Sequence, residues 1–196
     1  MKVLILPGYL GGKRWCAGLT KSLEANGFEV HVASVHWLKR NYFKYPFSPM
    51  SQWLENAKSE YQKLDPNETI IIGYSYGCIL AMALAASRNP ARLLLCSITN
   101  NFSEDITSHR ADWHLPWEVA DFKKFSFNVL ASNISCPVQI LYGDGEDAGS
   151  SNFMQRTHGA EAVFGQSAKK VVNVPKHYEG FKRLSYQREV IKVIGR

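Results

Sequence analysis

The sequence contains no apolar run as long as the ~18 residues that a membrane-spanning helix requires. It has only four cysteines, and no two of them form a Cys-x-x-Cys pair. That spacing argues against disulfides and against a metal site, and it favours free thiols in a reducing compartment. Linkers, internal repeats and low-complexity segments are missing as well. We therefore expect one domain over residues 1–196, located in the cytoplasm.

The first residues, MKVLILPGYLGG, resemble a signal peptide only weakly. Their apolar stretch is short, Pro7 and Gly8 interrupt it, and no small-residue cleavage site follows. We interpret this stretch as a first buried strand. The formal charge of +6 is mild and typical of a solvated surface. The sequence thus predicts neither a membrane nor a nucleic acid as partner, and any protein partner stays open.

Apolar strand patterns alternate with helical patterns along the chain. The strands are expected at residues 3–6, 28–35, 69–72, 92–98, 138–142 and 169–174, and the helices at 14–26, 49–64, 76–87 and 178–194. This alternation predicts an α/β fold, a three-layer α/β/α sandwich with a mostly parallel sheet of about six strands. The last helix should bury Phe181, Leu184, Ile191 and Ile194 on one side. Residues 36–50 and 99–137 look irregular.

The segment Gly73-Tyr74-Ser75-Tyr76-Gly77 joins an isoleucine strand to an alanine-rich helix. A sharp strand-to-helix turn holds a serine in a strained conformation and exposes its hydroxyl, and it needs small neighbours where strand and helix nearly collide. The following helix adds its positive end. These features indicate a nucleophilic serine. The alternative is a glycine turn with an incidental serine.

Four motifs occur in an order that resembles the α/β-hydrolase superfamily: PGYLGG at 7–12, GYSYG at 73–77, YGDGED at 142–147 and PKHYEGF at 175–181. The chain starts directly at the strand that bears the first motif. It is therefore similar to the small serine hydrolases related to the retinoblastoma-binding serine hydrolase. The resemblance implies a Ser–acid–His triad and neither a metal nor an organic cofactor.

The resemblance assigns the nucleophile to Ser75 and the general base to His177, which follows the last strand. The acid should come from the loop after residues 138–142, where Asp144, Glu146 and Asp147 are candidates. Family spacing leaves Glu146 or Asp147, and we prefer Asp147 because aspartate is usual there. The alternative for His177 is a surface histidine at a helix start. The alternative for the three carboxylates is a simple polar turn.

The oxyanion hole is expected to use backbone N–H groups of Tyr9 and Tyr76, with Leu10 next in the first motif. Leu10, Tyr74 and Trp113 are predicted to bind substrate. A short flap over residues 100–117 should take the place of a separate cap domain.

The aromatic and basic segment 36–53, with Lys39, Arg40 and Lys44, could wall an acyl pocket. It could equally be a packed loop with solvated lysines, and nucleic-acid binding is disfavoured because no known module accompanies it. We predict a carboxylesterase-like serine hydrolase that acts on a small acyl ester, thioester or amide. The alternative functions are a binding module on a hydrolase scaffold, and an acyltransferase or lyase that uses the same site.

Overall fold

The computed structural model describes residues 1–8, 12–33, 49–98, 120–121, 123–146, 153–174 and 176–195. Its centre is one sheet of six strands in the order β2-β1-β3-β4-β5-β6, and every neighbouring pair is parallel. This confirms the predicted parallel sheet. The strands are β1 (Lys2–Leu6), β2 (Glu29–Val32), β3 (Thr69–Tyr74), β4 (Arg92–Cys96), β5 (Val138–Gly143) and β6 (Lys169–Val171).

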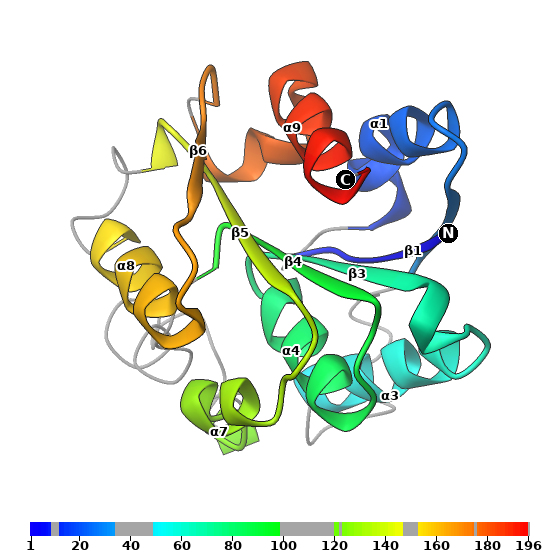
Figure 1. Ribbon diagram of the computed structural model, residues 1–196, viewed down its shortest axis with the longest axis vertical. Helices are drawn as coiled ribbons and strands as arrows, with labels where there is room; N and C mark the ends of the chain where they lie inside the picture. The colour runs from blue at the N-terminus through cyan, green and yellow to red at the C-terminus, as the bar shows by residue number, and fades with distance from the viewer. Residues whose placement is uncertain are drawn as a thin grey trace.

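Helices cover both faces of the sheet, as Figure 1 shows, with α1 and α9 on one side and α3, α4 and α7 on the other. The layered sandwich is therefore confirmed. The α-helices are α1 (Lys13–Glu24), α3 (Pro49–Tyr61), α4 (Gly77–Ser87), α7 (Phe127–Ser132), α8 (Phe153–Phe164) and α9 (Leu184–Ile194), and the 3-10 turns are η1 (Pro66–Glu68) and η4 (His177–Lys182).

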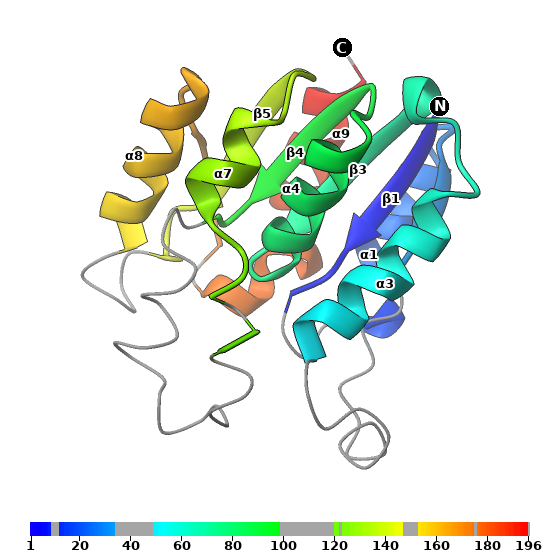
Figure 2. The same ribbon diagram turned by 90° about the horizontal axis from the view of Figure 1, so that it is seen from below.

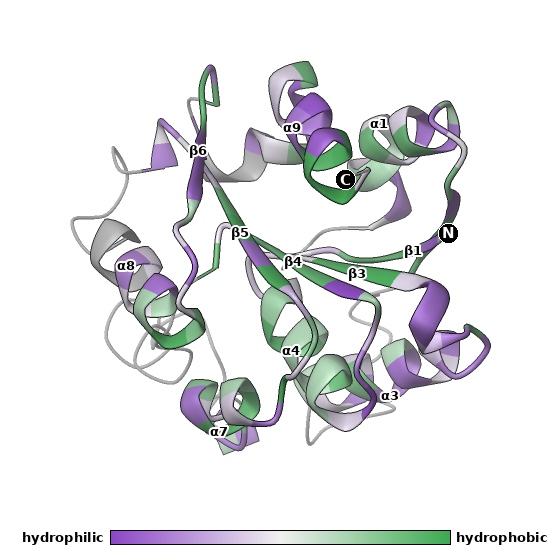
Figure 3. Ribbon diagram, in the orientation of Figure 1, coloured by the Kyte–Doolittle hydropathy of each residue, from purple (hydrophilic) through white to green (hydrophobic). Residues whose placement is uncertain are grey.

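Two apolar clusters, one on each face of the sheet, form the core. Ile71 of β3 packs on the α3–α4–α7 side, whereas Ile70 and Ile72 face α1 and α9, because side chains alternate along a strand. Helix α4 lies between the sheet and its neighbours and is apolar nearly all round, as is typical of a buried helix. Figure 3 shows this pattern as green central strands and a green α4, with purple residues on the outer helices.

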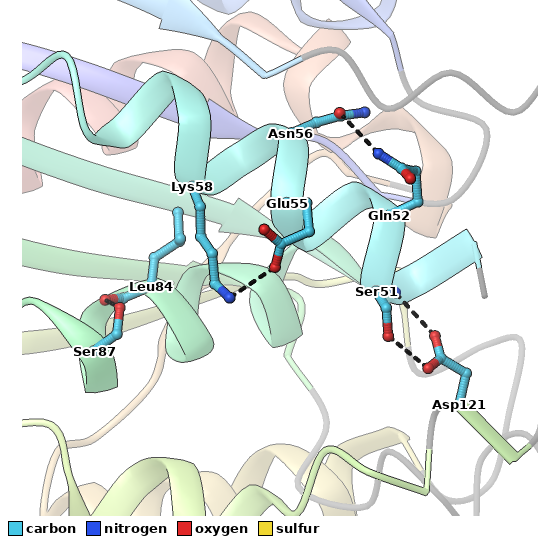
Figure 4. A network of polar contacts seen from close by, with 8 residues as sticks. All are labelled: Ser51, Gln52, Glu55, Asn56, Lys58, Leu84, Ser87 and Asp121. Atoms are coloured by element: carbon cyan, nitrogen blue, oxygen red, sulfur yellow. Dashed lines mark hydrogen bonds and ion pairs between the residues drawn. The ribbon is translucent and has the colours of Figure 1, made fainter. Parts of the chain in front are cut away.

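Helix α3 begins at Pro49, the first helical position that the sequence predicts, and its face Trp53, Ala57 and Tyr61 is buried as expected. Trp53, the last residue of the aromatic segment 36–53, therefore packs in the core. The carboxylate of Asp121, 1% exposed, caps the helix start. It accepts hydrogen bonds from the Ser51 backbone N–H (2.9 Å) and hydroxyl (2.6 Å), as Figure 4 shows.

The expected helix over 178–194 is wrong in its first third. The chain forms the separate 3-10 turn η4, then an extended residue, Arg183 with ψ of 129°, and only then α9. The interruption shifts the helical phase, so Leu184 is 65% exposed, while Tyr186 and Val190 are buried instead. The cause is tertiary: Gly180 and Phe181 of η4 pack against Tyr74 of the central strand β3.

Strands β2 and β6 form the two edges of the sheet, and both are short. β6 ends at Val171 rather than at residue 174, and its Lys169 and Lys170 are exposed. Helix α7 lies inside the region expected to be irregular, and α8 was not predicted; both are short or weakly patterned. In the described part of the chain, no helix has the length and apolar character needed to cross a bilayer.

Candidate functional site

The carboxyl ends of β1 and β3 mark the switch point of this sheet. The chain leaves β1 toward β2 on one side and crosses back to β3 on the other, so the two connections diverge there. Ligands of open α/β sheets bind at such points. Gly8 lies just after β1, and Ser75 directly follows β3. In Figure 2, η4 lies at the end of the sheet toward which the β1 arrow points.

Ser75 sits in the left-handed region with φ of 51°, which a non-glycine residue adopts at a cost of about 1–2 kcal/mol. Its backbone N–H donates to the Cys96 carbonyl (2.9 Å), and its own carbonyl accepts from the Cys78 N–H (2.9 Å) at the start of α4. The side chain is half-buried, whereas Tyr74 before it is fully buried. The strained strand–turn–helix that the sequence predicts is therefore confirmed.

The glycines on either side of this turn stand where backbones meet. A Cβ on Gly77 would lie 2.0 Å from the carbonyl oxygen of Leu6, and one on Gly73 would lie 2.7 Å from the Cα of Cys78. Neither neighbour is a flexible side chain that could move aside. The expected close approach of strand and helix is thus present, and it brings β1 against the first turn of α4.

The chain after β1 lies directly against the serine. A Cβ on Gly8 would be 3.0 Å from the Cβ of Ser75 and 3.7 Å from its hydroxyl oxygen. Tyr76, the second predicted oxyanion residue, directly precedes α4 and so stands at the positive end of that helix. Tyr9, Leu10 and Trp113 lie outside the described residues, so their assignments remain predictions.

His177 is the first residue of η4, and the turn is fixed to the strand that carries Ser75. The Phe181 ring lies 4.6 Å from the ring of Tyr74, centroid to centroid, and a Cβ on Gly180 would meet the Tyr74 hydroxyl. The residue before the candidate nucleophile therefore packs on the turn that bears the candidate base. The His177 side chain lies outside the part of the chain that the structure describes.

The Tyr74 side chain is 1% exposed and lies among Trp15, Phe181 and Tyr186. Burial first, and then the charge of Glu146, raise the pKa of its hydroxyl well above the usual value. This placement corrects the expectation that Tyr74 contacts substrate, because the ring has no surface for one. Strand alternation explains the difference: Tyr74 points to the core face that also holds Ile72.

Asp144 has a structural role. Its carboxylate accepts hydrogen bonds from the backbone N–H groups of Asn173 (3.0 Å) and Val174 (2.9 Å). The Val174 N–H contributes most to lowering the pKa of Asp144. The neighbouring Gly145 N–H donates to the Val174 carbonyl (3.0 Å). Asp144 thus holds the turn that follows β6 and leads toward His177.

Replacement of Asp144 by asparagine should lower stability at neutral pH by about 1 kcal/mol, or about 2–4 °C in Tm, because charge-assisted hydrogen bonds are lost. The folded-state pKa is depressed, so this contribution is present above the unfolded pKa of about 4 and is lost as pH falls through the folded value. Thermal melts from pH 7 to pH 2 should therefore show the two proteins converging at low pH. A constant gap over that range would contradict this role.

Glu146 is the carboxylate that the structure describes deepest in this loop, at 4% exposure. Its Oε1 accepts hydrogen bonds from the Ser97 hydroxyl (2.6 Å) and from the Gly143 backbone N–H (2.9 Å). Ser97 follows β4 and has φ of 56°, a second strained serine at the carboxyl edge of the sheet. In the sequence, Ser97 stands out only as a polar residue near the end of an apolar strand pattern. Asp147, the preferred acid, lies outside the described residues.

The four cysteines are poorly suited to the role of nucleophile, because burial raises the pKa of each thiol. All four cysteines are free, as predicted, and burial raises the pKa of Cys16 to about 12 and that of Cys136 to about 11. His31 pairs with Glu29 in β2, far along the chain from Ser75. No group of three His, Cys, Asp or Glu side chains suited to a metal ion occurs among the residues placed in the structure.

No protein-family model matches the sequence, and no curated protein matches it. Solved structures do. Est1E from Butyrivibrio proteoclasticus is 14% identical with a TM-score of 0.73, covering 100% of this chain and 88% of its own. The thioesterase domain from the curacin biosynthetic pathway is 14% identical with a TM-score of 0.68, over 100% and 90% of the two chains. Mouse α/β hydrolase domain-containing protein 10 is 13% identical with a TM-score of 0.62, over 99% and 88%.

The chain has the α/β-hydrolase fold. In this fold, the Gly-x-Ser-x-Gly turn at Ser75 lies between strand β3 and helix α4. Identities of 14% or less establish the fold alone. The closer relation to the small serine hydrolases that the motifs suggest stays a prediction.

Proposed function

We propose that the protein is a serine hydrolase that cleaves a carboxylic ester, thioester or amide through an acyl-enzyme on Ser75. The observation that carries the proposal is the strained, half-exposed Ser75 at the sheet's switch point, between β3 and α4. Strained backbone persists where the surrounding structure holds it, and such sites are commonly functional. A glycine would fit this conformation without strain, so a serine here points to a use for its hydroxyl.

In the proposed mechanism, His177 takes the Ser75 proton as the hydroxyl attacks the substrate carbonyl. Negative charge then develops on the carbonyl oxygen, where the backbone N–H groups of Tyr76 and Tyr9 would stabilise it. The positive end of α4 adds to this field. His177 returns the proton to the leaving group, and water, activated by the same imidazole, then releases the acyl group from Ser75.

The expected substrates are small acyl compounds with short or medium chains. The name of one similar structure, the thioesterase domain from the curacin biosynthetic pathway, agrees with hydrolysis of an acyl compound. The location that the sequence predicts for this reaction is the cytoplasm. We expect the reaction to use no metal and no organic cofactor, because each step above is carried by side chains and backbone of this chain.

A fluorophosphonate probe should label the intact protein on Ser75, as read by peptide mass spectrometry, because such probes react with activated serines. A panel of p-nitrophenyl esters of increasing chain length then reports the acyl preference. Ser87→Ala is a matched control, since Ser87 lies at the other end of α4 with its hydroxyl bonded to the Leu84 carbonyl; this variant should label normally. If the folded wild-type protein neither labels nor turns over any ester, thioester or amide, the proposed function fails and a binding module on this scaffold is favoured.

A further inference from the structure

A serine–carboxylate pair, Ser97 and Glu146, is buried beside the nucleophile turn. We propose that Glu146, rather than Asp147, is the acid that supports His177, and that Ser97 is the residue that positions it. This inference rests on the proposed function, because it names further members of the same site.

The pair is tied to Ser75 through consecutive strand ends. The Cys96 carbonyl, at the end of β4, accepts a hydrogen bond from the Ser75 N–H, and Ser97 is the residue directly after that strand. The Ser97 N–H in turn donates to the Leu141 carbonyl of β5 (2.7 Å). The carboxyl ends of β3, β4 and β5 therefore stand side by side, carrying the candidate nucleophile, the positioning serine and the loop with the acid.

The same loop is tied to the chain that leads to His177. The Gly145 N–H donates to the Val174 carbonyl, and the Asp144 carboxylate accepts hydrogen bonds from the N–H groups of Asn173 and Val174, four and three residues before the histidine. Asp144 is engaged by that turn. The loop that carries Glu146 is thus hydrogen-bonded both to the strand ends beside Ser75 and to the turn that precedes His177, and an acid that orients the imidazole is expected in such a loop.

The Glu146 carboxylate is held in one orientation. The Ser97 hydroxyl and the Gly143 N–H both donate to one carboxylate oxygen, Oε1. Burial of a carboxylate is costly unless donors compensate it, so a nearly fully buried one with two donors is a built feature. Burial is the larger cause of the raised pKa of Tyr74, Cys78, Cys96 and Tyr186, and the charge of Glu146 adds to it in each case.

The backbone conformation of Ser97 indicates that its hydroxyl has a role. At φ of 56°, glycine would be accommodated without strain, yet the chain places a serine there. What serine adds over glycine is the hydroxyl that donates to Glu146 at 2.6 Å. In the proposed site, this bond fixes the carboxylate so that it can hold the His177 tautomer and stabilise its imidazolium.

The decisive measurement is kcat and KM on the best ester for Glu146→Gln, Asp147→Asn and a matched control. Glu146→Gln should lower kcat by about 10³–10⁴-fold, because the amide no longer stabilises the imidazolium. Asp147→Asn should lose far less. Asp121→Asn is the matched control: it also neutralises a buried carboxylate that accepts a serine hydroxyl at 2.6 Å and a backbone N–H at 2.9 Å. It should destabilise the fold and keep kcat within about threefold.

Ser97→Ala and Ser97→Gly separate positioning from stability. Both remove the hydroxyl, but glycine relieves the left-handed strain, so Ser97→Gly should melt at the higher temperature. We expect both variants to lower kcat equally, by about 10–100-fold with KM little changed, as loss of a positioning hydrogen bond does. If kcat instead follows Tm, Ser97 only supports the fold and its proposed role is wrong.

The outcomes also distinguish this inference from the proposed function. If Ser75 labels and turns over ester while Glu146→Gln stays active and Asp147→Asn does not, the function stands and Glu146 is not the acid. If the wild-type protein neither labels nor turns over, the proposed function fails and the inference fails with it. A loss confined to Glu146→Gln and the two Ser97 variants, with Asp121→Asn active, supports the inference.

Discussion

Replacement of Ser75 by alanine should lower kcat/KM on a p-nitrophenyl ester by about 10⁴-fold or more, and His177→Ala should do the same. The double variant should be little slower than either single one, because the two groups act as one unit in attack and proton transfer. Thermal stability should stay close to that of the wild type. Steady-state kinetics and thermal melts of the three proteins test this expectation.

Ser75→Gly provides a sharper control for this prediction. It removes the hydroxyl as alanine does, but it also relieves the strain at φ of 51°, so it should be as inactive as Ser75→Ala and equally or more stable, by up to about 1 kcal/mol. Additive losses in the Ser75 and His177 variants would mean that the two residues act independently. A large loss of stability with retained activity in His177→Ala would make that residue structural.

Gly77→Ala should destabilise the fold by about 4 kcal/mol or more, or prevent folding. Alanine normally stabilises a helix relative to glycine by about 1 kcal/mol. Here the added Cβ would lie 2.0 Å from the Leu6 carbonyl oxygen and 2.7 Å from that of Pro7, so β1 and α4 would have to separate. The clash outweighs the helix propensity. Chemical denaturation, or soluble yield if the variant does not fold, measures the loss.

Gly12→Ala is the matched control, because a Cβ at that position meets nothing within 4 Å. Gly12 has φ of −132° at the N-cap of α1, a conformation that alanine adopts readily. Its stability should change by less than about 1 kcal/mol. If Gly77→Ala behaved like Gly12→Ala, the close contact between β1 and the first turn of α4 would not exist in solution.

The parts of the fold that the sequence predicts are those set by local pattern. Runs of isoleucine and leucine in β3 and β4 indicate strands buried on both faces, and buried parallel strands require helices on each side. The turn at Ser75 was predictable for the same reason: Gly73 and Gly77 mark a close approach, and the strand and helix patterns fix its context.

The features that escaped prediction depend on contacts between distant segments. The interruption between η4 and α9 arises because Gly180 and Phe181 pack on Tyr74, more than a hundred positions earlier in the chain. Nothing in the apolar pattern of residues 178–194 records that contact. The core position of Tyr74 escaped prediction too, because the motif around Ser75 does not indicate which of its neighbours face the apolar core.

The choice of the acid likewise depends partly on the sequence and partly on contacts between distant segments. The sequence narrows the candidates to three carboxylates in one loop, and family spacing leaves two. In the structure, the Asp144 carboxylate accepts hydrogen bonds from the turn at Asn173 and Val174, and Glu146 is buried against Ser97. Ser97 is an ordinary serine in the sequence. Its importance depends on a bond across 49 residues, which no local pattern encodes.

The margins of the sheet bear on how copies of this chain behave at high concentration. A sheet margin with unpaired N–H and C=O groups can template pairing with another molecule. Here one margin is only three residues long and carries Lys169 and Lys170, and the other is four residues long and begins with Glu29. Short, charged edge strands disfavour pairing with the edge strand of another copy. A concentrated sample should therefore not form fibrils by edge-to-edge pairing of the native sheet.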